Sequence, residues 1–306
     1  MANVPSSARF IDPSALGRIG SLDLLAKTVV EGFISGLHRS PFLGRSMDFA
    51  EYRAYMPGDD IRQIDWKLFS RTDRFYVKEF EGDTNTNVVL ALDVSRSMDF
   101  GTVETGAGTM TKLDYGRYLA ASLGYFASRQ RDRIGLMTFD SDVVDIVPPA
   151  AKHLDVVLHT IDRVTPGGAG KLTPPMFRLG TSVRRRGFVV VISDFYEAPD
   201  DVVRAVQGLR VRGNDLILFH LLDPAEIDFP YDEPSDFADL ETGTRVAVSP
   251  EAFREQYRKL ILDHIETLQK RFVEIGIDYV LVNTSEPLDA ALYRYLASRL
   301  WAMKSR

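Results

Sequence analysis

The residues with the clearest potential for chemistry stand directly after one apolar run. The run Asn87–Leu92 is followed by Asp93, Ser95 and Ser97, so one carboxylate and two hydroxyls alternate along the chain. Carboxylate and hydroxyl oxygens are hard ligands that suit Mg²⁺ or Mn²⁺. We therefore predict a divalent cation site here. The same residues would also fit a simpler arrangement, in which Asp93 ends a strand and a serine caps the next segment.

A second acid follows another apolar run. Phe188–Ile192 is succeeded by Ser193 and Asp194. Ligands of α/β sheets collect at the carboxyl ends of the strands, so we expect Asp194 to lie beside Asp93. Two carboxylates would neutralise a divalent ion, and the hydroxyls would add no charge. Because Mg²⁺ takes six oxygens and keeps waters where the protein supplies fewer, such a site favours recruitment of a ligand over catalysis.

An alternation of strand and helix patterns must position these residues. Runs such as Val189–Ile192 are apolar at every position, as a parallel sheet covered by helices on both faces requires. The alternation predicts an α/β fold with a doubly wound, mostly parallel sheet. Strands are expected at residues 88–93, 134–139, 143–147, 188–193, 215–221 and 277–282, and helices at roughly 112–130, 151–163, 174–186, 199–211, 250–274 and 287–302.

The same patterns divide the chain into three parts. Residues 1–19 contain prolines, serines and glycines and are expected to form a flexible N-terminus. Residues 20–86 are expected to form an N-terminal α+β elaboration, with a helix from Ser21 to about Gly36 followed by turns and short strands. Residues 87–306 carry the α/β domain. An irregular insertion, rich in proline and acidic residues, is expected at about 223–248.

Composition excludes several classes of function. The 306 residues contain no cysteine, which rules out disulfides and thiolate metal sites, and the net charge of −6 is unlike that of a general nucleic-acid binder. The basic run Arg184–Arg186 is interpreted as a helix C-terminus capped by Gly187. The N-terminus lacks a signal-peptide pattern, and no apolar stretch reaches the roughly 18 residues of a membrane span, so we predict a cytoplasmic protein.

The alternating acid and serines resemble the first motif of the metal-ion-dependent adhesion site of von Willebrand factor A domains. The resemblance implies a third contribution, from a threonine in a glycine-rich loop that opens a helix, and Thr165–Pro175 occupies that place. The usual threonine directly follows the glycine pair, where this chain has Ala169, so Thr173 is the candidate ligand. In A domains one carboxylate often reaches the ion through water, which leaves the ion open to an acidic residue of a protein partner.

A longer resemblance covers residues from about 22 to 300. The segments similar to the signature of the family called domain of unknown function 58 are Ser40–Trp66, Phe69–Phe80, Leu222–Pro230 and Asp239–Gly243. The resemblance implies an A-domain protein encoded beside a MoxR-type AAA+ ATPase and acting as a non-enzymatic adaptor in chaperone-like assembly. The chain resembles the short soluble subgroup of this family, which lacks N-terminal membrane helices.

Other interpretations stay open beside the adaptor. One is a Mg²⁺-dependent phosphohydrolase, although a haloacid-dehalogenase-type enzyme would need an acid where Ser95 stands. Another is an interaction protein whose metal site is vestigial. Gly167–Lys171 lacks the Walker pattern, so any ATPase activity is expected in a partner. Residues Pro57–Trp66 either dock the N-terminal region on the α/β domain or bind a partner.

Overall fold

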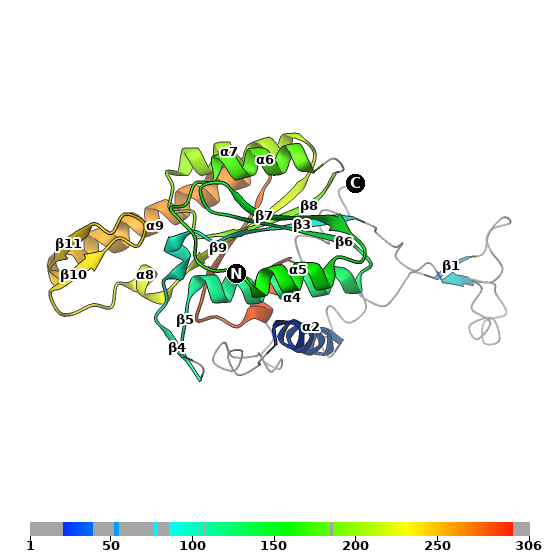
Figure 1. Ribbon diagram of the computed structural model, residues 1–306, viewed down its shortest axis with the longest axis horizontal. Coiled ribbons are helices and arrows are strands. Elements are labelled where there is room, and N and C mark those ends of the chain that lie inside the picture. Colours follow the sequence, from blue (N-terminus) through cyan, green and yellow to red (C-terminus); the bar gives the residue numbers. More distant parts are fainter. Residues whose placement is uncertain are drawn as a thin grey trace.

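A six-stranded sheet with helices on both faces forms the centre of the molecule (Figure 1). The computed structural model describes residues 21–38, 52–54, 76–78, 86–106, 108–183 and 186–295. Four predictions lie wholly or partly outside these ranges: the flexible residues 1–19, the two interpretations of Pro57–Trp66, the helix end at Arg184 and Arg185, and residues 296–302 of the helix predicted at 287–302.

The strands of the central sheet run in the order β12-β9-β8-β3-β6-β7. Neighbours pair in parallel except β6 and β7, which are antiparallel. After β3, the next strand of the sheet, β6, lies on one side of β3, and the later strand β8 lies on its other side. The strand order therefore reverses at β3, and α/β folds bind ligands at such switch points. The bounds are β3 (Asn87–Asp93), β6 (Arg133–Phe139), β7 (Val143–Ala150), β8 (Gly187–Ser193), β9 (Asp215–Leu222) and β12 (Asp278–Asn283).

Two layers of helices cover the sheet (Figure 1). One face carries α2 (Leu22–His38), α4 (Lys112–Arg129) and α5 (Leu154–Asp162), and the other carries α6 (Thr173–Ser182), α7 (Pro199–Val211) and α9 (Pro250–Glu274). Residues 288–295 are also helical and pack on the α2 and α4 face, where the ring of Tyr295 meets that of Phe126 edge to face.

The core explains why the central strands are apolar at every position. Leu90 and Leu92 of β3 pack into the cluster that includes α4, whereas Val89 and Ala91 pack into the cluster that includes α6 and α7. Successive side chains of a strand point to opposite faces, so a sheet covered on both sides buries all of them. Each large aliphatic side chain buried in this way stabilises the fold by about 1.5–3 kcal/mol.

The structure confirms the predicted fold class and all six predicted strands of the central sheet. It also corrects some boundaries: β7 extends to Ala150, α6 ends at Ser182, and Gly187 begins β8 instead of capping a helix. Two short antiparallel pairs accompany the sheet. They are β1 (Tyr52–Ala54) with β2 (Tyr76–Lys78) and β4 (Val103–Thr105) with β5 (Gly108–Met110), of which the second pair was not predicted.

The insertion at about 223–248 is more regular than predicted. It contains α8 (Pro224–Asp228) and an antiparallel hairpin of β10 (Ser235–Ala238) and β11 (Arg245–Val248). The prediction was wrong because Pro224 begins a helix instead of breaking one, as proline does in a first turn. Asp223 and Glu226 form a reciprocal capping box that starts this helix.

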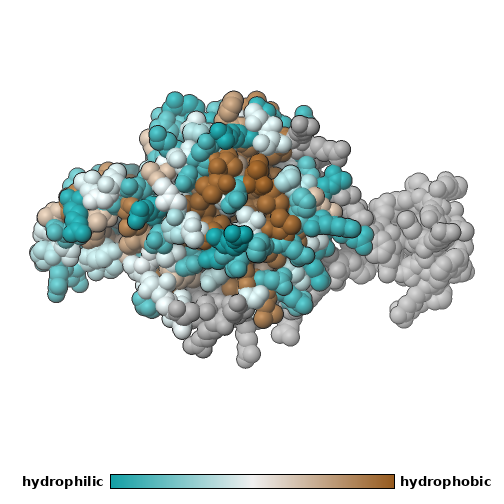
Figure 2. All heavy atoms as spheres, in the orientation of Figure 1, coloured by the Kyte–Doolittle hydropathy of each residue, from teal (hydrophilic) through white to brown (hydrophobic). Residues whose placement is uncertain are grey.

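The surface carries apolar side chains on one edge of the sheet. Figure 2 shows them between the two helix layers, on the side where Figure 1 places the edge strand β7. Val144 and Ile146 of β7 are exposed, as are Val156 of α5 and Phe177 of α6.

Candidate metal-binding site and adjoining cavity

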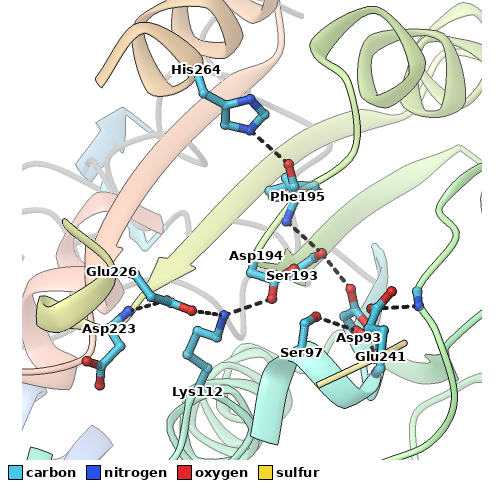
Figure 3. A network of polar contacts seen from close by, with 12 residues as sticks. Asp93, Ser97, Lys112, Ser193, Asp194, Phe195, Asp223, Glu226, Glu241 and His264 are labelled. Atoms are coloured by element: carbon cyan, nitrogen blue, oxygen red, sulfur yellow. Dashed lines mark hydrogen bonds and ion pairs between the residues drawn. The ribbon is translucent and has the colours of Figure 1, made fainter. Parts of the chain in front are cut away.

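The two predicted acidic ligands lie at adjacent strand ends. Because β3 and β8 pair in parallel, Asp93 ends one strand beside the position where Asp194 follows the other. The hydroxyl of Ser193 donates a hydrogen bond of 2.6 Å to Asp93 Oδ2, which ties the two strand ends together (Figure 3). Both acids are buried. The structure therefore brings together the carboxylates that the strand-end argument paired.

Ser95 and Ser97 complete a cluster of oxygens on the β3 side. A turn of 3₁₀-helix at Arg96–Asp99 folds the chain so that the two hydroxyl oxygens lie 3.1 Å apart. The backbone N–H of Ser95 donates to Asp93 Oδ1 at 2.8 Å. Each oxygen of the Asp93 carboxylate thus accepts one hydrogen bond, from Ser95 or Ser193, and keeps a lone pair that can face a cation.

The electrostatics of Asp93 favour a bound cation. Burial, followed by the negative charge of Asp194, raises the pKa of Asp93 to about 7, although hydrogen bonds from Ser193 and Ser95 oppose the rise. A divalent ion at this place would stabilise the ionised carboxylate. The donor set of carboxylate and hydroxyl oxygens also suits Mg²⁺ or Mn²⁺. The residues present therefore fit such an ion.

Lys112 adds a positive charge that the sequence did not reveal as part of the site. It is the first residue of α4, is fully buried, and its Nζ lies 2.8 Å from Asp194 Oδ2 and 2.7 Å from Glu226 Oε1 (Figure 3). Burial lowers the pKa of Lys112, but the charges of Asp194 and Glu226 outweigh it and raise the pKa above its ordinary value. A lysine after Thr111 gives no sequence signal, because first-turn lysines are usually solvated.

A sharp turn behind Asp194 orients its carboxylate. Phe195 adopts a left-handed backbone conformation with φ of 45°, which is uncommon for a residue other than glycine. The carbonyl of Phe195 accepts a hydrogen bond of 2.9 Å from the Nε2 of His264, and its N–H donates to the Ser193 hydroxyl at 3.1 Å. These contacts hold the turn that directs Asp194 toward Lys112 (Figure 3).

The glycine-rich loop docks against the first motif. The N–H of Gly167 donates to the carbonyl of Val94 at 2.6 Å, and Arg96 N–H donates to the carbonyl of Gly168 at 2.9 Å. Asp140 Oδ2 accepts from Gly168 N–H at 3.0 Å, and a β-carbon at Gly167 would lie only 2.6 Å from the same oxygen. A side chain at position 167 would therefore displace the Asp140 carboxylate that accepts from Gly168 N–H.

Thr173 occupies a different place from the other candidates. It is the first residue of α6 and its side chain is exposed. The cavity beside the site is lined instead by the segment just before Thr173, which consists of Gly170, Lys171 and Leu172. The assignment of Thr173 as a ligand stays a prediction, whereas Asp93, Ser95, Ser97 and Asp194 converge.

A cavity of about 640 Å³ opens beside these oxygens. One end is polar and contains Asp93, Ser95, Ser97 and Asp194. The other end is aromatic and is formed mainly by the insertion and α9, with Phe229, Tyr231, Phe237 and Tyr257 in its wall. The ring of Phe229 lies 4.9 Å from that of Tyr257 and stacks on Phe237 at 5.4 Å. The arrangement suits a ligand that is charged at one end and apolar at the other.

A metal site built from clustered histidine and acidic side chains finds less support. Within the part of the chain that the structure describes, no group of three or more histidine, aspartate or glutamate side chains is placed to hold a metal ion. The candidate site instead combines two carboxylates with hydroxyls, the kind of donor set that hard cations use.

Comparison with known proteins places the chain among relatives of unknown function. Residues 51–267 match the family described as "Protein of unknown function DUF58". The chain is 27% identical over 295 residues to "Uncharacterized protein Rv1480" of Mycobacterium tuberculosis and to "Uncharacterized protein Mb1516" of Mycobacterium bovis. Each alignment covers 94% of this chain and 90% of the relative.

Solved structures resemble the chain at low identity. BatB from Bacteroides thetaiotaomicron is 16% identical, with a TM-score of 0.49, 72% of this chain covered and 100% of BatB. An aerotolerance-related membrane protein from Bacteroides fragilis is 17% identical, with a TM-score of 0.49 and coverage of 68% and 97%. The SpRpn10 VWA domain is 12% identical, with a TM-score of 0.42 and coverage of 69% and 94%. These likenesses concern the fold alone.

The comparisons contradict the cytoplasmic location predicted from the sequence. Two of the similar solved structures are described as a membrane protein and a membrane-spanning protein. Across the described ranges, no helix combines the length and apolarity needed to cross a bilayer. We assign no compartment to this chain.

Proposed function

The chain belongs to the DUF58 family, and we propose that it recruits a protein partner through a divalent cation held at the ends of β3 and β8. The observation that carries this proposal is the convergence of Asp93, Ser95, Ser97 and Asp194 at one sheet edge, beside a cavity. In this proposal the ion is Mg²⁺ or Mn²⁺, and an acidic residue of the partner completes its coordination.

The chemistry of the donor set supports recruitment. Mg²⁺ requires six oxygens, and the chain supplies fewer from its converging side chains, so waters would fill the remaining positions. A partner's carboxylate can replace such a water and also offset the positive charge of the ion. The aromatic wall of the cavity would then take an apolar side chain of the partner next to that acid.

The class of partner comes from the resemblance of the sequence. We propose a MoxR-type AAA+ ATPase or its client, with ATP hydrolysis carried out by the ATPase and no reaction catalysed by this chain. The oxygen cluster serves binding in this proposal, so generic phosphoesters should not be turned over with Mg²⁺ or Mn²⁺.

One observation favours a second candidate, a partner-binding protein that uses no cation. The ammonium group of Lys112 already compensates Asp194 and Glu226 in the buried network. The strand ends would then be a structural polar cluster. Partner binding in this case depends on the cavity wall and not on Asp93.

A Mn²⁺ titration followed by calorimetry distinguishes the two candidate functions. We expect wild-type protein to bind Mn²⁺ and Asp93→Ala to lose this binding. Asp99→Ala is the matched control, because Asp99 is an exposed acid on the same 3₁₀-helix and should bind within about twofold of wild type. Equal binding by wild type and Asp93→Ala would overturn the cation site.

A pull-down then tests the partner. A purified MoxR-type ATPase should be retained by wild type in Mg²⁺ and released in EDTA, and Asp93→Ala should retain little in either condition. Equal retention of the ATPase by wild type and Asp93→Ala, in Mg²⁺ and in EDTA, would support the cation-free candidate. Hydrolysis of a phosphoester by wild type that is lost in Asp93→Ala would favour the phosphohydrolase.

A further inference from the structure

The hairpin formed by β10 and β11 supplies one part of the cavity wall. Its residues Phe237–Glu241, Thr244 and Val246 line the cavity, as does the glycine-rich loop with Gly170–Leu172. Figure 1 places the hairpin at one end of the molecule, beside α9 and outside the central sheet. The cavity is therefore bordered both by a loop that docks on the strand ends and by a hairpin that projects from the α/β domain.

The base of the hairpin is fixed by several contacts. The ring of Phe237 lies 5.4 Å from that of Phe229 and 4.9 Å from that of Tyr231. Arg254 of α9 donates hydrogen bonds to the carbonyl of Tyr231 at 2.7 Å and to Asp232 Oδ1 at 2.6 Å. Aromatic packing and an ion pair to a long helix therefore hold this end in place.

Among the described residues, one polar contact joins the tip of the hairpin to the rest of the chain. Glu241 Oε1 accepts a hydrogen bond of 2.9 Å from the N–H of Gly170 in the glycine-rich loop (Figure 3). The other hydrogen bonds of residues 239–244 within that part of the chain stay inside the hairpin. Residues 239–244 are exposed, so water can take the place of Gly170 when the contact breaks.

The tip is braced internally and can move as one piece. Asp239 Oδ1 accepts hydrogen bonds from the N–H groups of Glu241 and Thr242, at 2.8 and 2.9 Å. Gly243, whose φ of 70° favours glycine, donates from its N–H to the carbonyl of Asp239 at 2.8 Å. These bonds do not involve the glycine-rich loop. Loss of the contact with Gly170 therefore frees the tip without unfolding the hairpin.

The glycine-rich loop, by contrast, is anchored without the hairpin. Gly168 N–H donates to Asp140 Oδ2 at 3.0 Å, and Leu172 N–H donates to Glu197 Oε1 at 2.5 Å. Asp140 follows β6 and Glu197 follows β8, so both acids belong to the α/β domain. Breaking the Glu241 contact should therefore move the hairpin and leave the loop in place.

We propose that the β10–β11 hairpin is a lid on the cavity, hinged at its aromatic base and latched at its tip by Glu241 on the N–H of Gly170. Opening of the latch admits a side chain of the partner to the aromatic wall. Leu240 and Val246 line the cavity although they are 41% and 57% exposed, so a ligand in the cavity would stabilise the closed lid by covering them. The lid and its latch need no cation, whereas the partner's entry beneath the lid rests on the proposed function.

Amide hydrogen exchange in the full chain tests the latch. We expect Glu241→Ala to speed exchange of the Gly170 N–H about tenfold, because that N–H loses a charged acceptor. The Leu172 N–H, which donates to Glu197, is the internal reference and should keep its rate. Glu251→Ala is the matched control, since Glu251 is an exposed acid in the first turn of α9. Equal Gly170 exchange in Glu241→Ala and Glu251→Ala would overturn the latch.

Labelling of an introduced thiol tests whether the hairpin controls access to the cavity. The chain contains no cysteine, and Ala225 is a buried residue of the cavity wall. Addition of Glu241→Ala to an Ala225→Cys variant should speed its reaction with dithiobisnitrobenzoate about tenfold. Ala205→Cys, at a buried position of α7 outside the cavity wall, should label at one rate with and without Glu241→Ala. An unchanged rate at position 225 would contradict the lid.

A locked hairpin separates the lid from the proposed function. A short bismaleimide should bridge Ala169→Cys and Thr242→Cys, two exposed positions next to the contacting residues. The bridged protein should bind the MoxR-type ATPase in Mg²⁺ about tenfold more weakly or worse, and the same variant capped with N-ethylmaleimide should keep its binding. Equal binding by the two preparations would overturn entry beneath the lid. If wild type retains no ATPase, the proposed function fails, and exchange and thiol labelling still decide the lid.

Discussion

The ends of β3 and β8 and the insertion at 223–248 border the same cavity but are held in different ways. At the strand ends, Asp93 and Asp194 are buried, and ladder hydrogen bonds and two apolar clusters fix the strands that carry them. In the insertion, the hairpin is exposed along most of its length and is joined to the rest mainly by rings around Phe229.

This difference predicts that the two regions differ in rigidity. Segments with few buried contacts open at a lower free-energy cost than core strands, and binding elements that move are drawn from such segments. The strand ends are therefore suited to hold an ion in a fixed geometry, whereas the hairpin should open at a lower free-energy cost. The following experiments test whether the two regions differ in this way, beginning with the largest expected effect.

Lys112→Met should reveal how firmly the strand-end region is held. The substitution leaves Asp194 and Glu226 buried without their shared cation, and breaking a buried pair costs about 3–5 kcal/mol. Urea unfolding in EDTA measures this loss. Saturating Mg²⁺ should restore part of the stability, because a divalent ion near Asp194 replaces the missing charge.

Lys171→Met is the control for that experiment. Lys171 lines the same cavity but is exposed, so its loss should change stability by less than about 0.5 kcal/mol. A Lys112→Met protein as stable as Lys171→Met would show that the buried network contributes little to the fold.

Side-chain truncations in the two regions should differ in whether they lower global stability or loosen the structure locally. Leu90→Ala removes a fully buried side chain from β3 and should lower the global free energy of unfolding by about 2–5 kcal/mol. Phe229→Ala should instead loosen the insertion locally, because its contacts lie within the aromatic cluster. Limited proteolysis should then cut within 231–248 while urea unfolding of the remainder changes less. Equal global losses would mean that the insertion and the sheet unfold together.

Two buried groups give the metal-free protein opposing pH dependences. Burial lowers the pKa of His220 from 6.5 to about 3, so between these values the unfolded chain binds a proton that folded His220 does not. This contribution weakens stability as pH falls below 6.5. Burial and the charge of Asp194 raise the pKa of Asp93 from 3.8 to about 7, so the folded state holds the extra proton there. That contribution weakens stability as pH rises.

Single variants should separate the two contributions. Each slope is at most about 1.4 kcal/mol per pH unit, and in wild type they largely cancel. In urea unfolding with EDTA between about pH 4.5 and 6, Asp93→Asn should become more stable as pH rises, because His220 alone remains. His220→Phe should become less stable over the same range. Identical slopes in the two variants would contradict this assignment.

The smallest effect is expected at Thr173. Its side chain is exposed at the start of α6 and Gly170–Leu172 line the cavity, so Thr173→Ala should alter Mn²⁺ affinity by no more than about twofold. A loss of tenfold or more in calorimetry would instead establish Thr173 as a ligand, through a shift of the loop when the cation binds.

The sequence by itself determined the sheet and the placement of its acids. Continuous apolar runs before Asp93 and Asp194 indicated buried parallel strands, and the carboxyl ends of such strands meet at one edge. Five of the six strands begin and end within one residue of the predicted positions, whereas β7 extends to Ala150, three residues beyond its predicted end. These features depend on burial pattern and backbone geometry, which a local stretch of sequence records.

Only the tertiary structure decided what surrounds those acids. Lys112 meets Asp194 across 82 residues and Glu226 across 114, and Glu241 meets Gly170 across 71. The aromatic wall likewise forms because the hairpin folds back onto α9. No local pattern encodes such pairs, because packing of distant elements brings the side chains together and burial then makes their charges interact strongly.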